Sequence, residues 1–145
     1  MKSDCRQTLL LLLLLGIGMA GCGGNAEPKL AEVTGKVTYK NKPLPGGMVV
    51  FLSDDGKRGV GAIQKNGTFK MKSPFGTVKA AVVTRNATKE SLKDGKRPAV
   101  KEVHMPSGVN PETLPSREFE YFETSGLSFD VTQNGQTIDI KLPAK

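Results

Sequence analysis

Residues 127–142 read LSFDVTQNGQTIDIKL, and apolar and polar side chains alternate along them with a period of two. The apolar positions on the two sides of the central Asn-Gly pair are Leu127, Phe129, Val131, Ile138, Ile140 and Leu142. Such alternation is typical of strands with one buried and one solvated face. Asn134-Gly135 favours the positive φ angles of a two-residue type I′ turn. We therefore predict an antiparallel hairpin that pairs residues 127–132 with residues 136–142.

The same period recurs toward the N-terminus, beginning near Glu32. Further strands are predicted over residues 33–40, 48–52, 58–64, 68–72 and 77–84, with turns at 66–67 and 73–76. The strand over 77–84 is apolar on both faces, so the segment that follows it is the candidate to cover one of them. Seven short strands separated by turns predict an all-β fold, a seven-stranded antiparallel Greek-key β-sandwich.

Residues 85–118 interrupt this pattern with four prolines and a stretch of mixed charge. A short helix is predicted over residues 88–93, with Thr88 as its N-cap. The remainder has no clear periodicity, and a loop of about 34 residues is long for a small domain. We interpret residues 85–118 as an insertion that is either functional or partly disordered.

Residues 1–21 have the layout of a secretory signal, with Lys2 and Arg6 at the start, an apolar stretch from Leu9, and small residues at the end. As a helix, the apolar stretch would span about 20 Å, whereas the hydrocarbon layer of a bilayer is about 30 Å thick. A cleaved signal is therefore favoured over a permanent transmembrane anchor.

The tetrad Met19-Ala20-Gly21-Cys22 resembles the bacterial lipobox. The resemblance implies cleavage between Gly21 and Cys22, a diacylglyceryl group on the Cys22 sulfur, and usually acylation of the new amino terminus. It also favours the outer over the inner membrane, because no Asp stands beside Cys22. The alternative is ordinary signal cleavage with Cys22 as a bystander. The other cysteine, Cys5, lies in the discarded segment, so no disulfide is expected in the mature chain.

The remaining chain divides into a tether and a domain. Residues 22–30 are predicted to form a flexible tether, whose eight residues after Cys22 reach about 15 Å. Residues 31–145 are predicted to form the sandwich domain, which this tether would hold close to the lipid surface.

Short motifs along the domain carry a family resemblance. In chain order these are residues 33–37 (VTGKV), 42–47 (KPLPGG), 66–69 (NGTF), 74–77 (PFGT) and 124–127 (TSGL). They resemble those of the small lipoproteins with a carboxypeptidase-regulatory-like, transthyretin-like domain found in planctomycete-type bacteria. The resemblance implies a β-sandwich over about residues 32–142 and specifies no activity.

Few residues offer catalytic chemistry. His104 is the only histidine, so no paired-histidine metal site is expected, and we expect His104 to be solvent-exposed. Asp54-Asp55-Gly56 is predicted to be a tight turn. Phe119, Tyr121 and Phe122 form an aromatic cluster that we interpret as a hydrophobic plug at one end of the sandwich. Alternatively, these rings are an exposed platform for sugar rings or a partner.

The chain is basic, with 21 Lys and Arg against 14 Asp and Glu, a formal net charge of +7. A basic group lies in the insertion and comprises Lys89, Lys93, Lys96, Arg97 and Lys101. The predicted export signal argues against a nucleic-acid partner, as does the absence of aromatic residues interleaved with the basic ones. Anionic lipid headgroups or envelope polysaccharide are compatible partners, while plain solubility is the favoured explanation of the charge.

These observations lead to one functional hypothesis and two alternatives. The hypothesis is a non-enzymatic cell-envelope protein without metal or cofactor, anchored to membrane lipid through acylated Cys22 and serving as a binding or structural module. The first alternative is a carbohydrate-binding or adhesion module that uses Tyr121 and Phe122. The second is a small-ligand carrier or an enzyme with its site in residues 85–118, where His104 would act as a general base.

Overall fold

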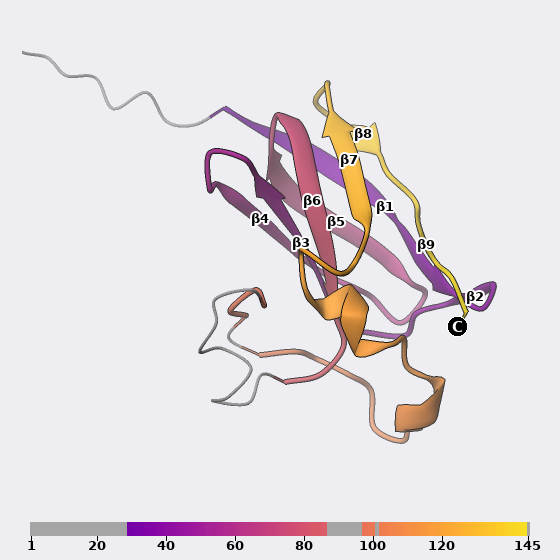
Figure 1. Ribbon diagram of the computed structural model, residues 1–145. Helices are drawn as coiled ribbons and strands as arrows, with labels where there is room; N and C mark the ends of the chain where they lie inside the picture. The colour runs from indigo at the N-terminus through magenta and orange to yellow at the C-terminus, as the bar shows by residue number, and fades with distance from the viewer. Residues whose placement is uncertain (1–28, 87–96, 101, 145) are drawn as a thin grey trace, which may run out of the picture.

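The computed structural model describes residues 29–86, 97–100 and 102–144, which form two β-sheets packed face to face (Figure 1). The first sheet is built around β1 (Leu30–Tyr39) and also contains β2 (Lys42–Pro43), β5 (Thr68–Pro74), β8 (Gln136–Thr137) and β9 (Ile140–Leu142). The second has the order β4-β3-β6-β7, with β3 at Met48–Ser53, β4 at Arg58–Ala62, β6 at Gly76–Val83 and β7 at Leu127–Val131.

The predicted all-β sandwich is confirmed, with nine strands in the described residues instead of seven. The extra strands arise because the short β2 pairs with the end of β1 and because the strand expected over residues 136–142 is broken into β8 and β9. In the second sheet β6 lies beside β3, although β4 and β5 separate them in the sequence. Such pairing between non-consecutive strands is a feature of Greek-key connections.

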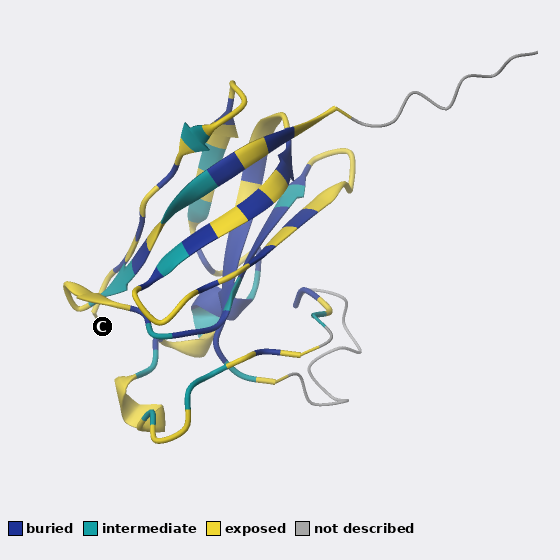
Figure 2. Cartoon of the chain, turned by 180° about the vertical axis from the view of Figure 1, so that it is seen from behind, coloured by how far each residue is buried: buried dark blue, intermediate teal, exposed yellow. Residues whose placement is uncertain are grey.

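The core lies between the two sheets, and buried residues alternate with exposed ones along β1, β4 and β5 (Figure 2). On β1 the buried and solvated positions follow the predicted period of two, with Val33 and Val37 fully buried. Phe51 of β3 stacks on Phe129 of β7 with ring centroids 5.8 Å apart. This stack lies within the second sheet, on its core face. Fully burying a side chain such as Val33 of the first sheet or Phe51 of the second contributes about 1.5–3 kcal/mol, so the buried residues of both sheets hold the sandwich together.

The outer face of the second sheet is also apolar and is covered by another part of the chain. Val50 of β3 and Ala81 and Val83 of β6 point away from the central core, and Val103 and Phe122 pack against them. Val103 belongs to the insertion, as do Val100 and Met105, which contact the same cluster. The prediction that the segment after residue 84 covers this strand is therefore confirmed. The helix predicted over residues 88–93 lies outside the described residues.

The predicted hairpin between residues 127–132 and 136–142 is wrong. β7 pairs with β6 in antiparallel fashion, whereas β8 and β9 pair with β1 in parallel, so the two segments lie in different sheets (Figure 1). The turn at Asn134-Gly135 carries the chain across the sandwich, and there only Gly135 has a positive φ, +77°. The Asn134 side chain accepts a hydrogen bond from the backbone N–H of Glu32, 2.7 Å away, which ties the turn to β1.

Asn66-Gly67 also lies where the chain passes from one sheet to the other, between β4 and β5. The type I′ geometry occurs instead at Lys40 and Asn41, whose φ angles are 50° and 62°. These two residues connect β1 to β2, with Tyr39 opposite Lys42. Positive φ at both central positions is the requirement of this turn type, and Lys40 meets it despite the usual preference for Asn or Gly.

The break between β8 and β9 brings the last part of the domain into close contact with Gly35 of β1. The N–H of Ile138 donates to the carbonyl of Thr34 over 2.8 Å, and the Asp139 carboxylate accepts from the N–H of Lys36 over 2.9 Å. A Cβ on Gly35 would lie 1.9 Å from the carbonyl oxygen of Ile138. Gly35 is thus required for the parallel pairing along β1.

We expect Gly35→Ala to lower the free energy of unfolding by about 3 kcal/mol, because the new methyl group displaces backbone rather than a flexible side chain. Urea denaturation should show a lower midpoint with an unchanged slope. Gly56→Ala is the control, since its Cβ meets nothing within 4 Å and only its positive φ costs about 1–2 kcal/mol. Equal losses in the two variants would contradict the proposed clash.

The turn between β3 and β4 is the tight turn predicted from Asp54-Asp55-Gly56, closed by a 2.9 Å bond from the N–H of Gly56 to the carbonyl of Ser53. The Asp55 carboxylate accepts a hydrogen bond from the Ser53 hydroxyl and pairs with the Lys57 ammonium over 2.7 Å. Lys57, followed by Ser53, lowers the pKa of Asp55 from 3.8 to about 2.

A pH dependence follows from this turn. Because the folded state holds the Asp55 proton less tightly than the unfolded state, the stabilisation is complete above pH 3.8 and is lost as the pH falls toward 2. Asp55→Asn should abolish this contribution, so the stability difference between wild type and variant should shrink between pH 4 and pH 2 in urea titrations. A difference that stays constant over that range would contradict the assignment.

Candidate functional site

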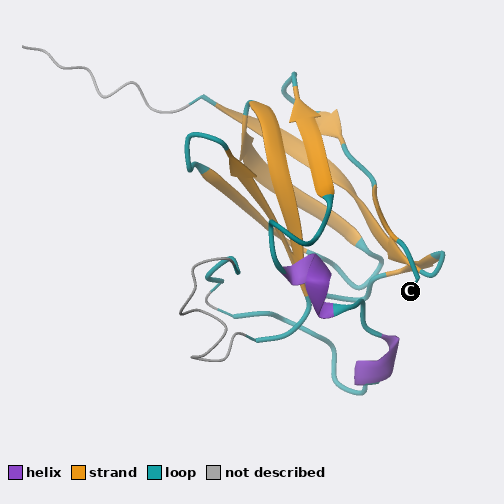
Figure 3. Ribbon diagram, in the orientation of Figure 1, coloured by secondary structure: helices purple, strands orange, loops and turns teal. Residues whose placement is uncertain are grey.

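The most concentrated polar chemistry of the described residues lies where β6 ends and the insertion begins. Two 3-10 turns, η2 (Pro111–Thr113) and η3 (Arg117–Glu120), lie at this end of the sandwich, opposite the entry of the chain into β1 (Figure 3). Glu120 at the end of η3 is only 3% exposed. Because burying an ionised carboxylate is costly unless it is paired, its partners decide whether this end of the domain is stable.

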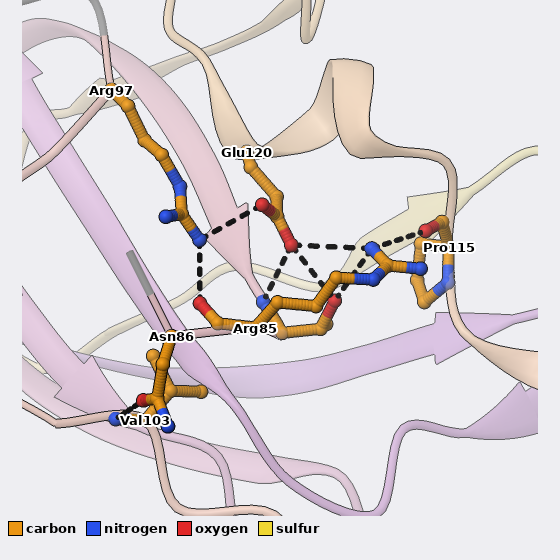
Figure 4. A network of polar contacts seen from close by, with 7 residues as sticks. Arg85, Asn86, Arg97, Val103, Pro115 and Glu120 are labelled. Atoms are coloured by element: carbon orange, nitrogen blue, oxygen red, sulfur yellow. Dashed lines mark hydrogen bonds and ion pairs between the residues drawn. The ribbon is translucent and has the colours of Figure 1, made fainter. Parts of the chain in front are cut away.

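Glu120 is bound through both of its oxygens (Figure 4). Its Oε1 accepts from the N–H of Thr84 over 3.3 Å and from the Thr84 hydroxyl over 3.1 Å, and it lies 3.2 Å from Nη1 of Arg85. Its Oε2 lies 2.9 Å from Nη2 of Arg97, which is itself 4% exposed. The carboxylate therefore joins β6, η3 and the insertion at one point.

The two arginines extend this network. Arg97 also donates to the backbone carbonyl of Arg85, and Arg85 donates to the carbonyl of Pro115 over 3.1 Å. Nearby, the side chain of Asn86 accepts from the N–H of Val103 over 3.0 Å, at the residue that packs on the outer face of β3 and β6. The network therefore holds in place the apolar residues that pack on the outer face of β3 and β6, which we call the cover (Val100, Val103, Met105 and Phe122). We call the residues around the buried carboxylate the Glu120 clamp (Thr84, Arg85, Arg97 and Glu120).

Sequence reasoning missed the Glu120 clamp. Arg97, a member of the basic group of the insertion, is buried and ion-paired with Glu120 and so is not available to an anionic partner. The other members, Lys89, Lys93, Lys96 and Lys101, lie outside the described residues. The available signal was the place of Glu120 between Phe119 and Tyr121, since an acidic residue inside an aromatic run is a candidate for a buried, paired charge.

The aromatic cluster is the predicted hydrophobic plug. Phe119 is 4% exposed and belongs to the central core, while Phe122 is 7% exposed and belongs to the cover. Tyr121 between them is half-buried. Phe122 does not belong to an exposed platform, because it is 7% exposed and packs in one cluster with Val50, Ala81 and Val83.

His104 is exposed, as expected, and lines a shallow groove of about 700 Å³ between the insertion and the turn after β4. Gln64, Asn66 and Thr68 supply other polar side chains of this groove. The backbone carbonyl of His104 accepts from the N–H of Gly47 over 3.1 Å, which holds this part of the insertion on the sandwich.

The predicted lipid attachment residue Cys22 and the cleavage point between Gly21 and Cys22 lie outside the described residues. Within residues 29–86, 97–100 and 102–144, no group of three or more His, Cys, Asp or Glu side chains could hold a metal ion. The same residues contain no helix long and apolar enough to cross a membrane.

We expect Glu120→Gln to lower the free energy of unfolding by about 3 kcal/mol, because it leaves the buried Arg97 guanidinium without its counter-charge. Urea denaturation measures the loss. The matched control is Glu32→Gln, which removes an exposed ion pair to Lys70 of 3.1 Å and should cost less than about 1 kcal/mol. A Glu120→Gln loss as small as that of the control would show that the clamp contributes little.

Comparison of the chain with protein-family models, with curated proteins and with solved structures found no match.

Proposed function

We propose that this chain is a non-enzymatic, lipid-anchored protein of the cell envelope, in which the β-sandwich is a binding or structural module. The observation that carries the proposal is the tetrad Met19-Ala20-Gly21-Cys22 at the end of an apolar stretch that is too short to cross a bilayer. The Cys22 thiol is the acceptor for the diacylglyceryl group, and the small residues before it give a peptidase access to the backbone.

The energetics of anchoring support this hypothesis. Each buried methylene contributes about 0.8 kcal/mol, and one saturated chain holds a protein only marginally on a membrane. A diacylglyceryl group supplies two chains on one residue, and acylation of the amino terminus adds a third. Anchoring through Cys22 would therefore be stable without any transmembrane segment.

The arrangement of the domain is compatible with such an anchor. β1 begins at Leu30, eight residues after Cys22, at the end of the sandwich opposite the Glu120 clamp (Figure 1). The two-sheet architecture also supports a relation to the carboxypeptidase-regulatory-like, transthyretin-like domains, which is part of the proposal. The outer membrane is the proposed location because of the lipobox resemblance, since no Asp stands beside Cys22.

The test is Cys22→Ala in the full chain, expressed in a host with the lipoprotein-processing enzymes. The variant should move from the detergent phase to the aqueous phase on phase partitioning, because it has no thiol to acylate. Cys5→Ala is the matched control and should partition as wild type does, since Cys5 lies in the segment that is removed. Retention of Cys22→Ala in the detergent phase would overturn the anchor.

A further inference from the structure

The large hydrophobic side chains that stay exposed gather at one corner of the sandwich. In the described residues these are Leu30, Val60 and Phe75, with exposed fractions of 40%, 45% and 42%. Leu30 and Val60 line the same open groove of about 510 Å³. Phe75 follows Pro74, which pairs with Leu30, so Phe75 lies close to Leu30 in the fold. Isolated exposed apolar residues are ordinary, whereas a group of them marks an interaction surface.

The corner is also basic. Arg58, Lys70 and Lys72 line the same groove, and the acidic residue that lines it, Glu32, is paired with Lys70. Arg58 and Lys72 are exposed and make no ion pair with any residue that the structure describes. Two cations are thus left to interact with an external anion.

Two glycines of β4 bring these side chains together. A Cβ on Gly59 would lie 2.4 Å from the carbonyl oxygen of Lys72, and one on Gly61 would lie 2.9 Å from the Cβ of Met71. Without side chains at these positions, β4 closes directly onto β5, although the two strands belong to different sheets. Arg58 and Val60 therefore lie next to Lys70 and Lys72 on a surface that is fixed by backbone contacts.

The chain enters the domain at this corner. Leu30 is both the first residue of β1 and part of the groove, and eight residues from Cys22 allow a reach of about 15 Å. The Glu120 clamp and the cover lie at the other end of the sandwich (Figure 3). A lipid layer that holds acylated Cys22 would thus be the nearest large surface to the corner.

We propose that this corner, comprising Leu30, Arg58, Val60, Lys72 and Phe75, docks on the lipid layer that carries the acylated Cys22. Phe75 and Leu30 enter the boundary between headgroups and acyl chains, while Arg58 and Lys72 contact anionic headgroups. The inference rests on the proposed function and adds to it a fixed orientation, with the cover and His104 facing away from the lipid.

The chain has no tryptophan, so a single introduced indole reports on this surface. The full-length lipidated protein carrying Phe75→Trp is reconstituted into vesicles of phosphatidylcholine and phosphatidylglycerol. We expect its emission to shift to shorter wavelength and to be quenched by brominated lipid. Ser107→Trp, an exposed position in the insertion, is the control and should remain accessible to aqueous quencher. Equal aqueous quenching of both indoles would overturn docking.

The role of the cations is tested by Arg58→Gln with Lys72→Gln in the Phe75→Trp background. Since one cation near an anionic surface contributes about 1 kcal/mol, the ratio of docked to undocked protein should fall about fivefold for each charge removed. The matched control is Lys79→Gln with Lys141→Gln, which removes two exposed charges from β6 and β9. An equal fall in the control would show that net charge, and not the corner, is responsible.

Detergent partitioning of the same preparations separates this inference from the anchor. If the Phe75→Trp protein enters the detergent phase while its indole stays in water on vesicles, docking is overturned and the anchor is left intact. Protein that fails to enter the detergent phase would overturn the anchor on which docking rests. A blue shift that grows with protein density but resists brominated lipid would assign the corner to contact between two copies of the chain, which also overturns lipid docking.

Discussion

The buried carboxylate of Glu120 is the constraint on which one half of the domain depends. At 3% exposure this charge requires compensation, and Arg97, Arg85 and Thr84 provide it from parts of the chain that are distant in sequence. Removing Glu120 would leave the buried Arg97 guanidinium without its counter-charge. The Glu120 clamp therefore fixes the path of the insertion, which packing of a few apolar side chains would leave less precisely defined.

The fixed path matters because β3 and β6 are apolar on both faces. One face belongs to the central core, and the other, with Val50, Ala81 and Val83, would be open to water without the cover. The insertion is therefore a structural part of the sandwich as well as a surface element. Its presence also gives the domain two different ends: the end that carries the cover buries its apolar side chains, including Val103 and Phe122.

Most strands could be predicted from the sequence, but the short β2 and the pairing of the last two predicted strands could not. Val131, Ile138 and Ile140 would point into the core whether the two strands formed a hairpin in one sheet or lay in opposite sheets of the sandwich. The hydrophobic periodicity therefore does not distinguish these two arrangements. Asn134-Gly135 correctly marked a turn, yet the open edges of β6 and β1 offered separate partners for the two strands. The Glu120 clamp was missed for a similar reason, because the sequence shows the charges of Arg97 and Glu120 but not their burial.

The two ends of the sandwich differ in how completely they bury large apolar side chains, and this difference supports a role for the exposed corner in an interaction. The chain buries large apolar residues efficiently even in its irregular insertion, where Val103 is 7% exposed. Leu30, Val60 and Phe75 nevertheless remain exposed on regular strands and a tight turn, where a polar residue would fit without loss of the fold. They stand beside two cations that pair with no acidic residue of the described chain, and at the point where the tether enters. A lipid surface combines an apolar interior with anionic headgroups, and docking on lipid is proposed because such a partner would account for all three features together.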